Sequence, residues 1–279
     1  MTQDPALHER WDLRFSRIEY LPKACPEDPQ RFLYSTRIGF GLVISGEGES
    51  VGERHRADGI RTSALRFKSD ERLSLIREGS GYWQYEPVAE GTRFRTNYDY
   101  RVRFGPLGKA LDLVFRPLIG WATAWSFDSL RLWAERDIPP ELSRLRAAIH
   151  AICRMTLAVV WLYHGLVPKL LFPETGEREL TRFLGIPEAF NAAFVTGIGI
   201  VECLFALSLV GLWHKRWLLA LQVPLLLLIP LGLVRHLEVF TRPFTPLSLN
   251  LSMAALALCG VLAARDLPRA GNCLRRPLP

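Results

Sequence analysis

The sequence contains little that indicates a metal, disulfide or hydrolase site. Its five cysteines form no Cys-x-x-Cys pair and show none of the spacings of a zinc site. His-Glu-x-x-His and Gly-x-Ser-x-Gly are both missing, which argues against a zinc protease or an α/β-hydrolase. The glycine cluster from Gly46 to Gly52 lacks the Gly-Lys-Ser/Thr ending of a phosphate loop, so we interpret it as a turn between strands. We expect neither a disulfide nor a bound metal.

Two further absences bear on location. The first 30 residues contain no uninterrupted apolar stretch, so we expect no cleavable signal peptide. Residues 1–142 carry no net charge, because they hold 21 Lys and Arg against 21 Asp and Glu. The entire net charge of +7 therefore belongs to residues 143–279, beside long apolar runs. A basic excess of this origin indicates a membrane as the partner, and not nucleic acid.

The second half of the chain is rich in long apolar segments. A helix needs roughly 20 apolar residues to cross a bilayer. The candidate segments are Ala147–Phe172, Ala189–Trp213, Trp217–Val234 and Leu247–Ala264. They predict an all-α transmembrane bundle of four helices over residues 145–265.

Loop charges indicate how this bundle is oriented. The connections on the side of the two termini hold eight Lys and Arg residues, against five on the other side. The positive-inside rule then predicts that both termini are cytoplasmic, with residues 266–279 forming a basic cytoplasmic tail. We expect a multi-pass protein of a bacterial inner membrane.

The first half of the chain shows strand patterns followed by one helix pattern. Short apolar or alternating runs predict strands at Ile38–Ser45, Ile60–Phe67, Arg72–Ile76, Tyr82–Val88 and Thr92–Phe104. The Glu90-Gly91 pair predicts a hairpin between the last two. Helical spacing of apolar residues continues from about Leu107 to Arg136, where two prolines soon follow. Residues 1–140 therefore predict a cytosolic α+β domain with a curved antiparallel sheet and a long C-terminal helix.

This order of elements over residues 30–137 resembles the START-like (helix-grip, SRPBCC) domains. The pair of short helices that this family has after its first strand is not evident here. The resemblance implies a cavity between helix and sheet for a lipid, an isoprenoid or another apolar ligand, with Trp121 and Trp125 as candidate ligand contacts. The alternative is an ordinary packed core, in which these tryptophans fill space or anchor the domain at the membrane surface.

Two opposite charges interrupt the first two apolar helices. Arg154 lies 15 residues before Lys169, hence about 22 Å below the outer end of the first helix. Glu202 lies 13 residues after Ala189 on the descending second helix, hence about 20 Å below the same surface. Charged groups inside a membrane are costly and are usually paired. We therefore predict an intramembrane ion pair between Arg154 and Glu202, with either a structural role or a role in handling a proton or ligand.

A second polar cluster is expected near the outer ends of the helices. Its predicted ligand-binding members are His164, Lys169, Arg235, His236 and Asn250. The hydrogen-bond donors in this set suit the carbonyl groups of a quinone head group. Interfacial anchoring and helix capping are the alternative explanation.

Three segments of the second half resemble the DoxX-like family of small four-helix membrane proteins. They read Trp161-Leu-Tyr-His164-Gly165-Leu-Val-Pro-Lys169, Gly197-Ile-Gly-Ile-Val-Glu202 and Pro243-Phe-Thr-Pro-Leu-Ser-Leu-Asn250-Leu. The resemblance covers roughly residues 145–265. The family is named after a subunit linked to quinol oxidase and to thiosulfate:quinone oxidoreduction.

The resemblance carries over His164, Gly165, Lys169, Glu202 and Asn250 as family positions. Thr245 stands where the family pattern has Asn between two prolines. Any role of a loop amide at that place is therefore in doubt for this chain.

Three functions remain open on this evidence. The soluble domain binds an apolar ligand, a lipid or a quinone-like molecule, beside the bundle. Alternatively, the chain is a quinone-interacting subunit of a membrane oxidoreductase, with a separate redox partner protein that supplies electrons. In the third, it is a structural or assembly protein that contacts membrane lipids only. The sequence does not decide whether the chain is an enzyme.

Overall fold

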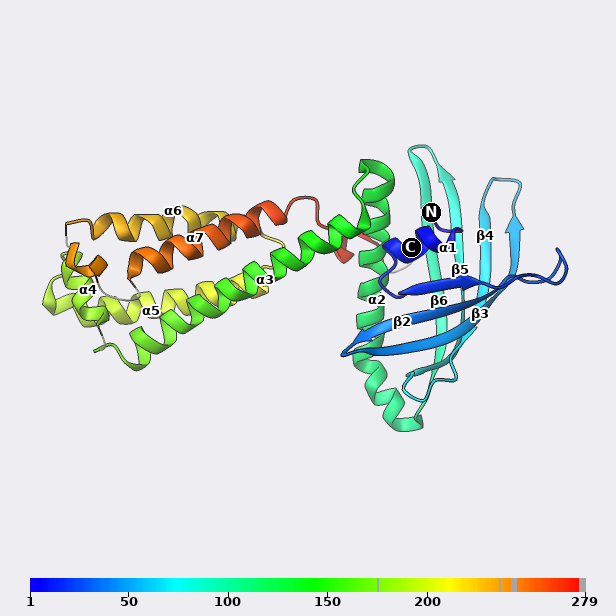
Figure 1. Cartoon of the computed structure of the whole chain (residues 1–279), viewed down its shortest axis with the longest axis horizontal. Helices are drawn as coiled ribbons and strands as arrows, with labels where there is room; N and C mark the ends of the chain where they lie inside the picture. Colours follow the sequence, from blue (N-terminus) through cyan, green and yellow to red (C-terminus); the bar gives the residue numbers. More distant parts are fainter. Residues whose placement is uncertain (175, 236, 242–244, 276–279) are drawn as a thin grey trace. The chain divides into compact units, whose positions relative to one another are not determined.

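The computed structural model describes residues 1–174, 176–235, 237–241 and 245–275 (Figure 1). The chain divides into two compact units. The sheet unit comprises Met1–Glu141 with the C-terminal residues from Pro268 onward, and the helical unit comprises Leu142–Leu267. The tail that we expected at 266–279 is therefore not a separate segment, since most of it belongs to the sheet unit.

The sheet unit is an antiparallel meander covered by helices. In the part of the chain that the structure describes, six strands pair strictly in sequence order. Its elements are α1 (Pro5–Trp11), β1 (Arg17–Tyr20), β2 (Arg31–Gly39), β3 (Leu42–His55), β4 (Arg61–Lys68), β5 (Ile76–Val88), β6 (Gly91–Val102), α2 (Gly105–Arg136) and the 3₁₀ turn η3 (Ala270–Asn272). The predicted α+β composition, an antiparallel sheet followed by a long helix, is confirmed.

Several local predictions in this unit are corrected. The segment from Gly46 to Gly52 is not a turn but lies inside β3. Two of its glycines are explained by packing, since a Cβ at Gly46 would overlap the Tyr34 ring and one at Gly48 would overlap the Phe32 ring. Absent side chains on β3 thus leave room for the aromatic rings of β2. The segment predicted as a strand at 72–76 contributes only its last residue to β5.

Helix α2 is the longest helix of this unit and crosses the sheet (Figure 1). Pro106 stands in its first turn, where a missing N–H costs nothing. The helix ends at Arg136, because Asp137 adopts a left-handed conformation. These bounds agree with the predicted helix over 107–136.

The C-terminal residues pack on the second half of α2. The carboxylate of Asp128, 1% exposed, accepts hydrogen bonds from the Arg269 amide at 2.7 Å and from the Asn272 side chain at 2.9 Å. The thiol of Cys273 donates to the Ala124 carbonyl at 3.2 Å. Arg131 completes the set with an ion pair to Asp128 at 2.9 Å. A buried carboxylate therefore fixes the segment 269–272 on α2.

The helical unit begins within the long helix that follows Pro139-Pro140. Its elements are α3 (Pro140–His164), the π-helical segment η1 (Gly165–Leu171), α4 (Glu177–Phe183), α5 (Glu188–Gly211), α6 (Trp217–Gly232), the 3₁₀ segment η2 (Leu237–Thr241) and α7 (Pro246–Ala263). A single buried cluster joins α3, α5, α6 and α7 through residues such as Leu157, Leu209, Leu219 and Ala257.

Three of these helical stretches are long and apolar enough to cross a membrane, within the residues described. They are Pro140–Leu171, Glu188–Gly211 and Pro246–Ala263. Helix α6 is apolar but shorter, and its apolar stretch within the described residues is Trp217–Leu228. The outward-facing side chains of these helices are mostly large and apolar, including Ile152, Val159, Leu204 and Leu258. Such a surface suits lipid and not water.

Candidate functional site

The inner face of the sheet encloses a cavity of about 340 Å³. Side chains from α1, from every strand of the sheet and from α2 line it. Pockets for small molecules typically measure roughly 300–1,000 Å³, so this cavity is large enough for a compact ligand.

Aromatic rings form a large part of the cavity wall. The aromatic lining residues are Phe15, Tyr20, Phe32, Tyr34, Phe67, Tyr82, Trp83, Tyr85 and Tyr98. Burial raises the pKa of Tyr34 to about 12, so its phenol stays protonated at neutral pH. The wall therefore offers apolar surface and neutral hydrogen-bonding groups.

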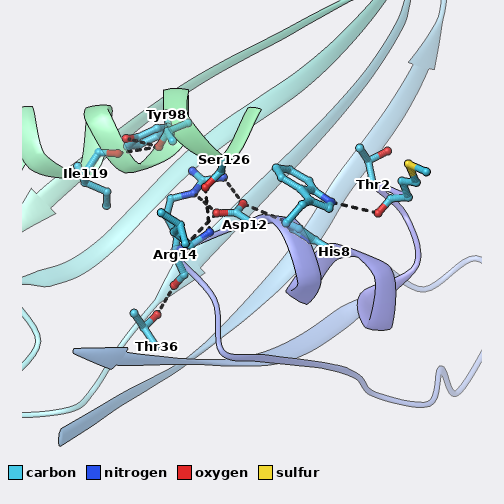
Figure 2. Close-up of polar contacts among 12 residues, drawn as sticks. Thr2, His8, Asp12, Arg14, Thr36, Tyr98, Ile119 and Ser126 are labelled. Carbon is cyan, nitrogen blue, oxygen red and sulfur yellow. Dashed lines mark hydrogen bonds and ion pairs between the residues drawn. The ribbon is translucent and has the colours of Figure 1, made fainter. Parts of the chain in front are cut away.

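One part of this wall carries a buried charged network (Figure 2). The Asp12 carboxylate receives two hydrogen bonds from the Arg14 guanidinium, at 2.9 and 2.7 Å. His8 Nε2 lies 3.1 Å from the same carboxylate, one helical turn earlier. His8 and Arg14 both line the cavity, whereas Asp12 lies behind them. A ligand in the cavity would thus meet a histidine and an arginine that one buried carboxylate holds in place.

The electrostatics of this network are set by Asp12. Burial by itself would raise the pKa of the Asp12 carboxyl. The Arg14 charge and the hydrogen bonds from His8 and Arg14 outweigh burial and hold the pKa well below its usual range. Asp12 is therefore an anion at neutral pH, and His8 Nε2 donates its hydrogen to it.

Neighbouring elements fix the segment that carries these residues. The Leu13 amide donates to Ser126 Oγ of α2 at 2.9 Å, and Thr36 Oγ1 of β2 donates to the Arg14 carbonyl at 2.5 Å (Figure 2). The His8 ring stacks on Trp11 at 4.9 Å and meets Trp83 edge-on at 4.9 Å. The network is preorganised from both sides, as a binding site requires.

The tryptophans predicted as ligand contacts do not line this cavity. Trp125 is buried in α2, and Trp121 of the same helix is 44% exposed. Ile119 is the α2 residue that reaches the cavity wall. Sequence reasoning missed the polar network at residues 8–14 because it assigned no element before residue 36. The i,i+4 spacing of His8 and Asp12 was the available signal.

The outer cluster of the helical unit is centred on Lys169. The Lys169 ammonium lies 3.1 Å from the Glu202 carboxylate and 3.4 Å from the Glu177 carboxylate. It also donates to the His164 carbonyl at 3.4 Å. The Lys169 and Glu202 side chains are only 12% and 13% exposed. Three of the five family positions, His164, Lys169 and Glu202, are thus brought together.

Close backbone contact sets the level of this cluster. A Cβ at Gly165 would lie 2.6 Å from the Gly199 carbonyl oxygen and 2.8 Å from Cys203 Sγ. Gly199 in turn lies against the Lys169 side chain. The π-helical segment η1 and helix α5 therefore approach each other more closely than any other residue at these two positions would allow.

The predicted Arg154–Glu202 ion pair is corrected by this register. Lys169 lies beside Gly199, ten residues further along α5 than the Ala189 level that we assumed, which is about 15 Å. Glu202 consequently meets Lys169. Arg154, about three helical turns before Gly165, meets the C-terminal end of α5 instead.

Arg154 is fully buried and is bound by carbonyl oxygens. Its guanidinium donates to the carbonyls of Leu209, Leu212 and Lys215 at 2.5, 2.7 and 3.3 Å. The Trp213 ring lies 5.8 Å from the Arg154 Cζ atom. Carbonyls at a helix C-terminus have no partner within their helix and carry partial negative charge. Arg154 thus caps α5, a structural role.

Two further buried polar contacts join α3 to α6 and to α7. Trp161 Nε1 donates to Gln222 Oε1 at 2.8 Å, and Gln222 is fully buried. His150 Nδ1 lies 3.2 Å from the Gly260 carbonyl oxygen, which joins the start of α3 to the end of α7. Sequence reasoning missed Gln222, whose signal was a lone amide in an otherwise apolar segment.

The remaining predicted members of the outer cluster are placed separately. Arg235 follows α6 and is exposed, whereas Asn250 is buried in α7. His236 lies outside the described residues. Thr245 is the N-cap of α7, where its hydroxyl accepts from the Ser248 amide at 3.3 Å. A threonine therefore performs at this place the capping that an asparagine side chain could also perform.

No group of three or more His, Cys, Asp or Glu residues suited to a metal ion occurs in the described part of the chain. Residues 158–258 match the DoxX-like family. The Uncharacterized membrane protein YndG of Bacillus subtilis (strain 168) is 47% identical over 181 residues, which cover 64% of this chain and 67% of YndG. The chain belongs to the DoxX-like family. No solved structure matches it.

Membership of the DoxX-like family and the likeness to a membrane protein agree with the apolar helices described above. The 181 matched residues outnumber the 126 residues from Leu142 to Leu267, so the similarity to YndG extends into the sheet unit. The recognition of a DoxX-like membrane protein is confirmed, whereas no comparison supports the START-like resemblance of the sheet unit.

Proposed function

We propose that this DoxX-like membrane protein binds a small apolar ligand in the cavity of its sheet unit. The observation that carries the proposal is the cavity wall, in which aromatic rings surround the His8–Asp12–Arg14 network. Apolar walls favour a hydrophobic body, and the few fixed donors select its polar end. The ligand class is therefore an amphiphile with a carbonyl or carboxylate group, such as a lipid or a quinone-like molecule. The helix-and-sheet cavity is also the feature that the START-like resemblance implied.

Native mass spectrometry of the full chain, released from membrane nanodiscs, tests this proposal. Leu65 lines the cavity, and the next residue on β4, Arg66, is exposed on the opposite face. Wild type should carry a stoichiometric small molecule. Leu65→Trp, which fills the cavity, should lose that molecule, whereas the matched control Arg66→Trp should keep it. A wild type without ligand would favour a structural or assembly role.

We further propose that α6 is the fourth crossing of a four-helix bundle with both termini in the cytoplasm. The contact between His150 in the first half of α3 and the Gly260 carbonyl near the end of α7 supports an even number of crossings. Three crossings come from the long apolar helices, and α6 contributes Leu218, Leu219 and Leu226 to their shared core. The basic residues on the side of the termini favour the cytoplasmic face of a bacterial inner membrane.

Tags at the two termini test this topology. In inverted membrane vesicles, antibodies should reach both tags, and in intact spheroplasts they should reach neither. Detection of one terminus alone in either preparation would overturn the even number of crossings.

The outer cluster supports a second candidate function, a quinone head-group site. Lys169 presents an ammonium group between two carboxylates beside the half-buried His164. A cationic donor next to carboxylates can donate a hydrogen bond to a carbonyl oxygen and can pass a proton to that oxygen when the quinone is reduced. A redox role would need a separate partner protein that delivers electrons. Titration with a soluble ubiquinone analogue should show saturable binding that Lys169→Met abolishes and that Arg235→Met, at an exposed site, retains.

A further inference from the structure

The two ends of the sheet differ in chemistry. In a sequential antiparallel meander, alternate connections fall on opposite ends. Residues 38–43, 69–75 and 102–107 therefore meet at one end, which we name the apolar rim. The β1–β2, β3–β4 and β5–β6 connections, at 21–30, 55–61 and 88–91, meet at the other end, which we name the polar rim.

Large hydrophobic side chains project from the apolar rim. Phe40 is fully exposed, and Leu73 and Leu107 are 65% and 63% exposed. Ile38, Leu42 and Phe104 are each about half exposed. The turns of the polar rim instead contain Arg56-Ala-Asp58-Gly and Ala89-Glu90, with Val88 as the exposed large hydrophobic residue there in the described chain. A cluster of apolar side chains confined to one rim indicates an interaction surface.

The backbone of the apolar rim adds independent evidence. Phe40 and Phe104 both have positive φ, 50° and 67°, and each precedes a glycine that also has positive φ. A large side chain is strained at positive φ, where Gly, Asn and Asp are preferred. By contrast, the residues with positive φ in the turns of the polar rim are the glycines Gly59 and Gly91. Two strained phenylalanines with exposed rings are not explained by folding stability.

Helix α2 continues the apolar surface. Leu107, Leu111, Val114, Leu118 and Trp121 recur at helical spacing, and each is 44% exposed or more. This stripe spans 14 residues, about 21 Å. An apolar stripe that ends in a tryptophan is typical of a helix that lies in a membrane interface.

The chain itself indicates that lipid covers this surface. Only three residues separate the end of α2 from α3, which is long and apolar enough to span a membrane. After α7, the chain returns to α2 and binds Asp128. The C-terminal half of α2 is thus connected to the first and the last of the apolar helices by short segments of chain.

We propose that the apolar rim and the exposed stripe of α2 insert into the headgroup region of the membrane that contains the helical unit. The exposed Arg37 beside the apolar rim would favour anionic lipids. Membrane contact at the rim does not depend on whether the cavity holds a ligand.

Spin labels in the full chain test this proposal. The five cysteines are replaced by alanine or serine, and labels are attached through Phe40→Cys, Val114→Cys or, as the control on the polar rim, Asp58→Cys. The proteins are placed in nanodiscs that contain phosphatidylglycerol. Labels at positions 40 and 114 should collide with dissolved oxygen and be shielded from an aqueous nickel chelate, and the label at 58 should show the reverse. Equal nickel access at 40 and 58 would overturn the proposal.

Further outcomes separate the alternatives. Immobile labels at 40 and 114, shielded from both oxygen and nickel, would mean that protein and not lipid covers the rim. Phe40→Asn combined with Phe104→Asn should leave the thermal stability unchanged or raise it, because Asn accepts positive φ. The same variant should increase nickel access at position 114. Loss of stability together with unchanged nickel access would show that the two rings serve the fold alone.

Discussion

Each unit of this protein withdraws one arginine from water, and the two units stabilise it in different ways. In the sheet unit, Arg14 is paired with the Asp12 carboxylate, which also holds His8. In the helical unit, Arg154 is fully buried and donates to three main-chain carbonyls at the end of α5. The sheet unit neutralises its charge with an opposite charge, whereas the helical unit uses helix-end dipoles. Only the sheet unit's arrangement has an acidic partner, the Asp12 carboxyl, that can gain a proton as the pH falls, because main-chain carbonyls do not titrate.

The largest expected effect comes from removing the carboxylate. Asp12→Asn leaves Arg14 buried without its counter-ion, and we expect a loss of about 3–5 kcal/mol in the free energy of unfolding of the sheet unit. Thermal unfolding followed by circular dichroism measures it, with the exposed Asp70→Asn as the control. The double variant Asp12→Leu with Arg14→Met should lose less than the two single variants together. Additive losses would contradict the paired description.

Arg154→Met should cost somewhat less, about 2–4 kcal/mol, because it strands carbonyls that are only partly charged. Arg154→Lys should recover part of the loss, since a compact ammonium cannot meet three separated carbonyls. The exposed Arg265→Met is the control. If Glu202→Gln recovered the stability lost in Arg154→Met in a thermal unfolding assay, the result would support the Arg154–Glu202 ion pair that the sequence predicted.

Main-chain packing in the helical unit gives the next effect. Gly165→Ala and Gly199→Ala should each cost about 1–3 kcal/mol, because the added Cβ meets backbone or side-chain atoms at under 3 Å. Gly197→Ala is a matched control two residues away, with no atom within 4 Å of its Cβ. Equal melting temperatures for the Gly197 and Gly199 variants would show that the close approach of η1 and α5 is not required.

The smallest effect is a difference in pH dependence. The pKa of Asp12 is lower in the folded unit than in the unfolded chain, where it is about 3.9. Its contribution is therefore complete above about pH 4 and is lost as the pH falls through the folded pKa. The stability gap between wild type and Asp12→Asn should close only in acid. The difference in the free energy of unfolding between wild type and Arg154→Met should stay constant between about pH 3 and pH 8. If it also decreased in acid, the two arginines would not differ in the way described.

The sequence predicted those elements whose signal is local. The spacing of apolar residues and the Pro139-Pro140 pair placed α2 within two residues, and the Glu90-Gly91 pair identified the β5–β6 hairpin. The Gly46–Gly52 cluster was misinterpreted because Gly46 and Gly48 are required by the packing of aromatic rings from the neighbouring strand β2. This steric requirement for a residue without a Cβ arises only after the strands pair.

The candidate sites were harder to predict for the same reason. The members of the outer cluster were partly recognisable, and Lys169 and Glu202 do meet. Which residues meet depends on the register of η1 against α5, which the contact of Gly165 with Gly199 sets. The spacing of apolar residues within one helix contains no information about this register. The network of His8, Asp12 and Arg14 becomes a site only because the meander curves around it, so its residues looked ordinary in the sequence.

The hydrogen bonds of Asp128 have a consequence for biosynthesis. The ribosome completes residues 1–141 long before it makes Arg269 and Asn272. Until then, the Asp128 carboxylate lacks two of its three donors, and the sheet unit is unfinished. Its completion therefore waits until α7 and the residues that follow it have been made, so the formation of these two hydrogen bonds couples the folding of the sheet unit to the synthesis of the helical unit.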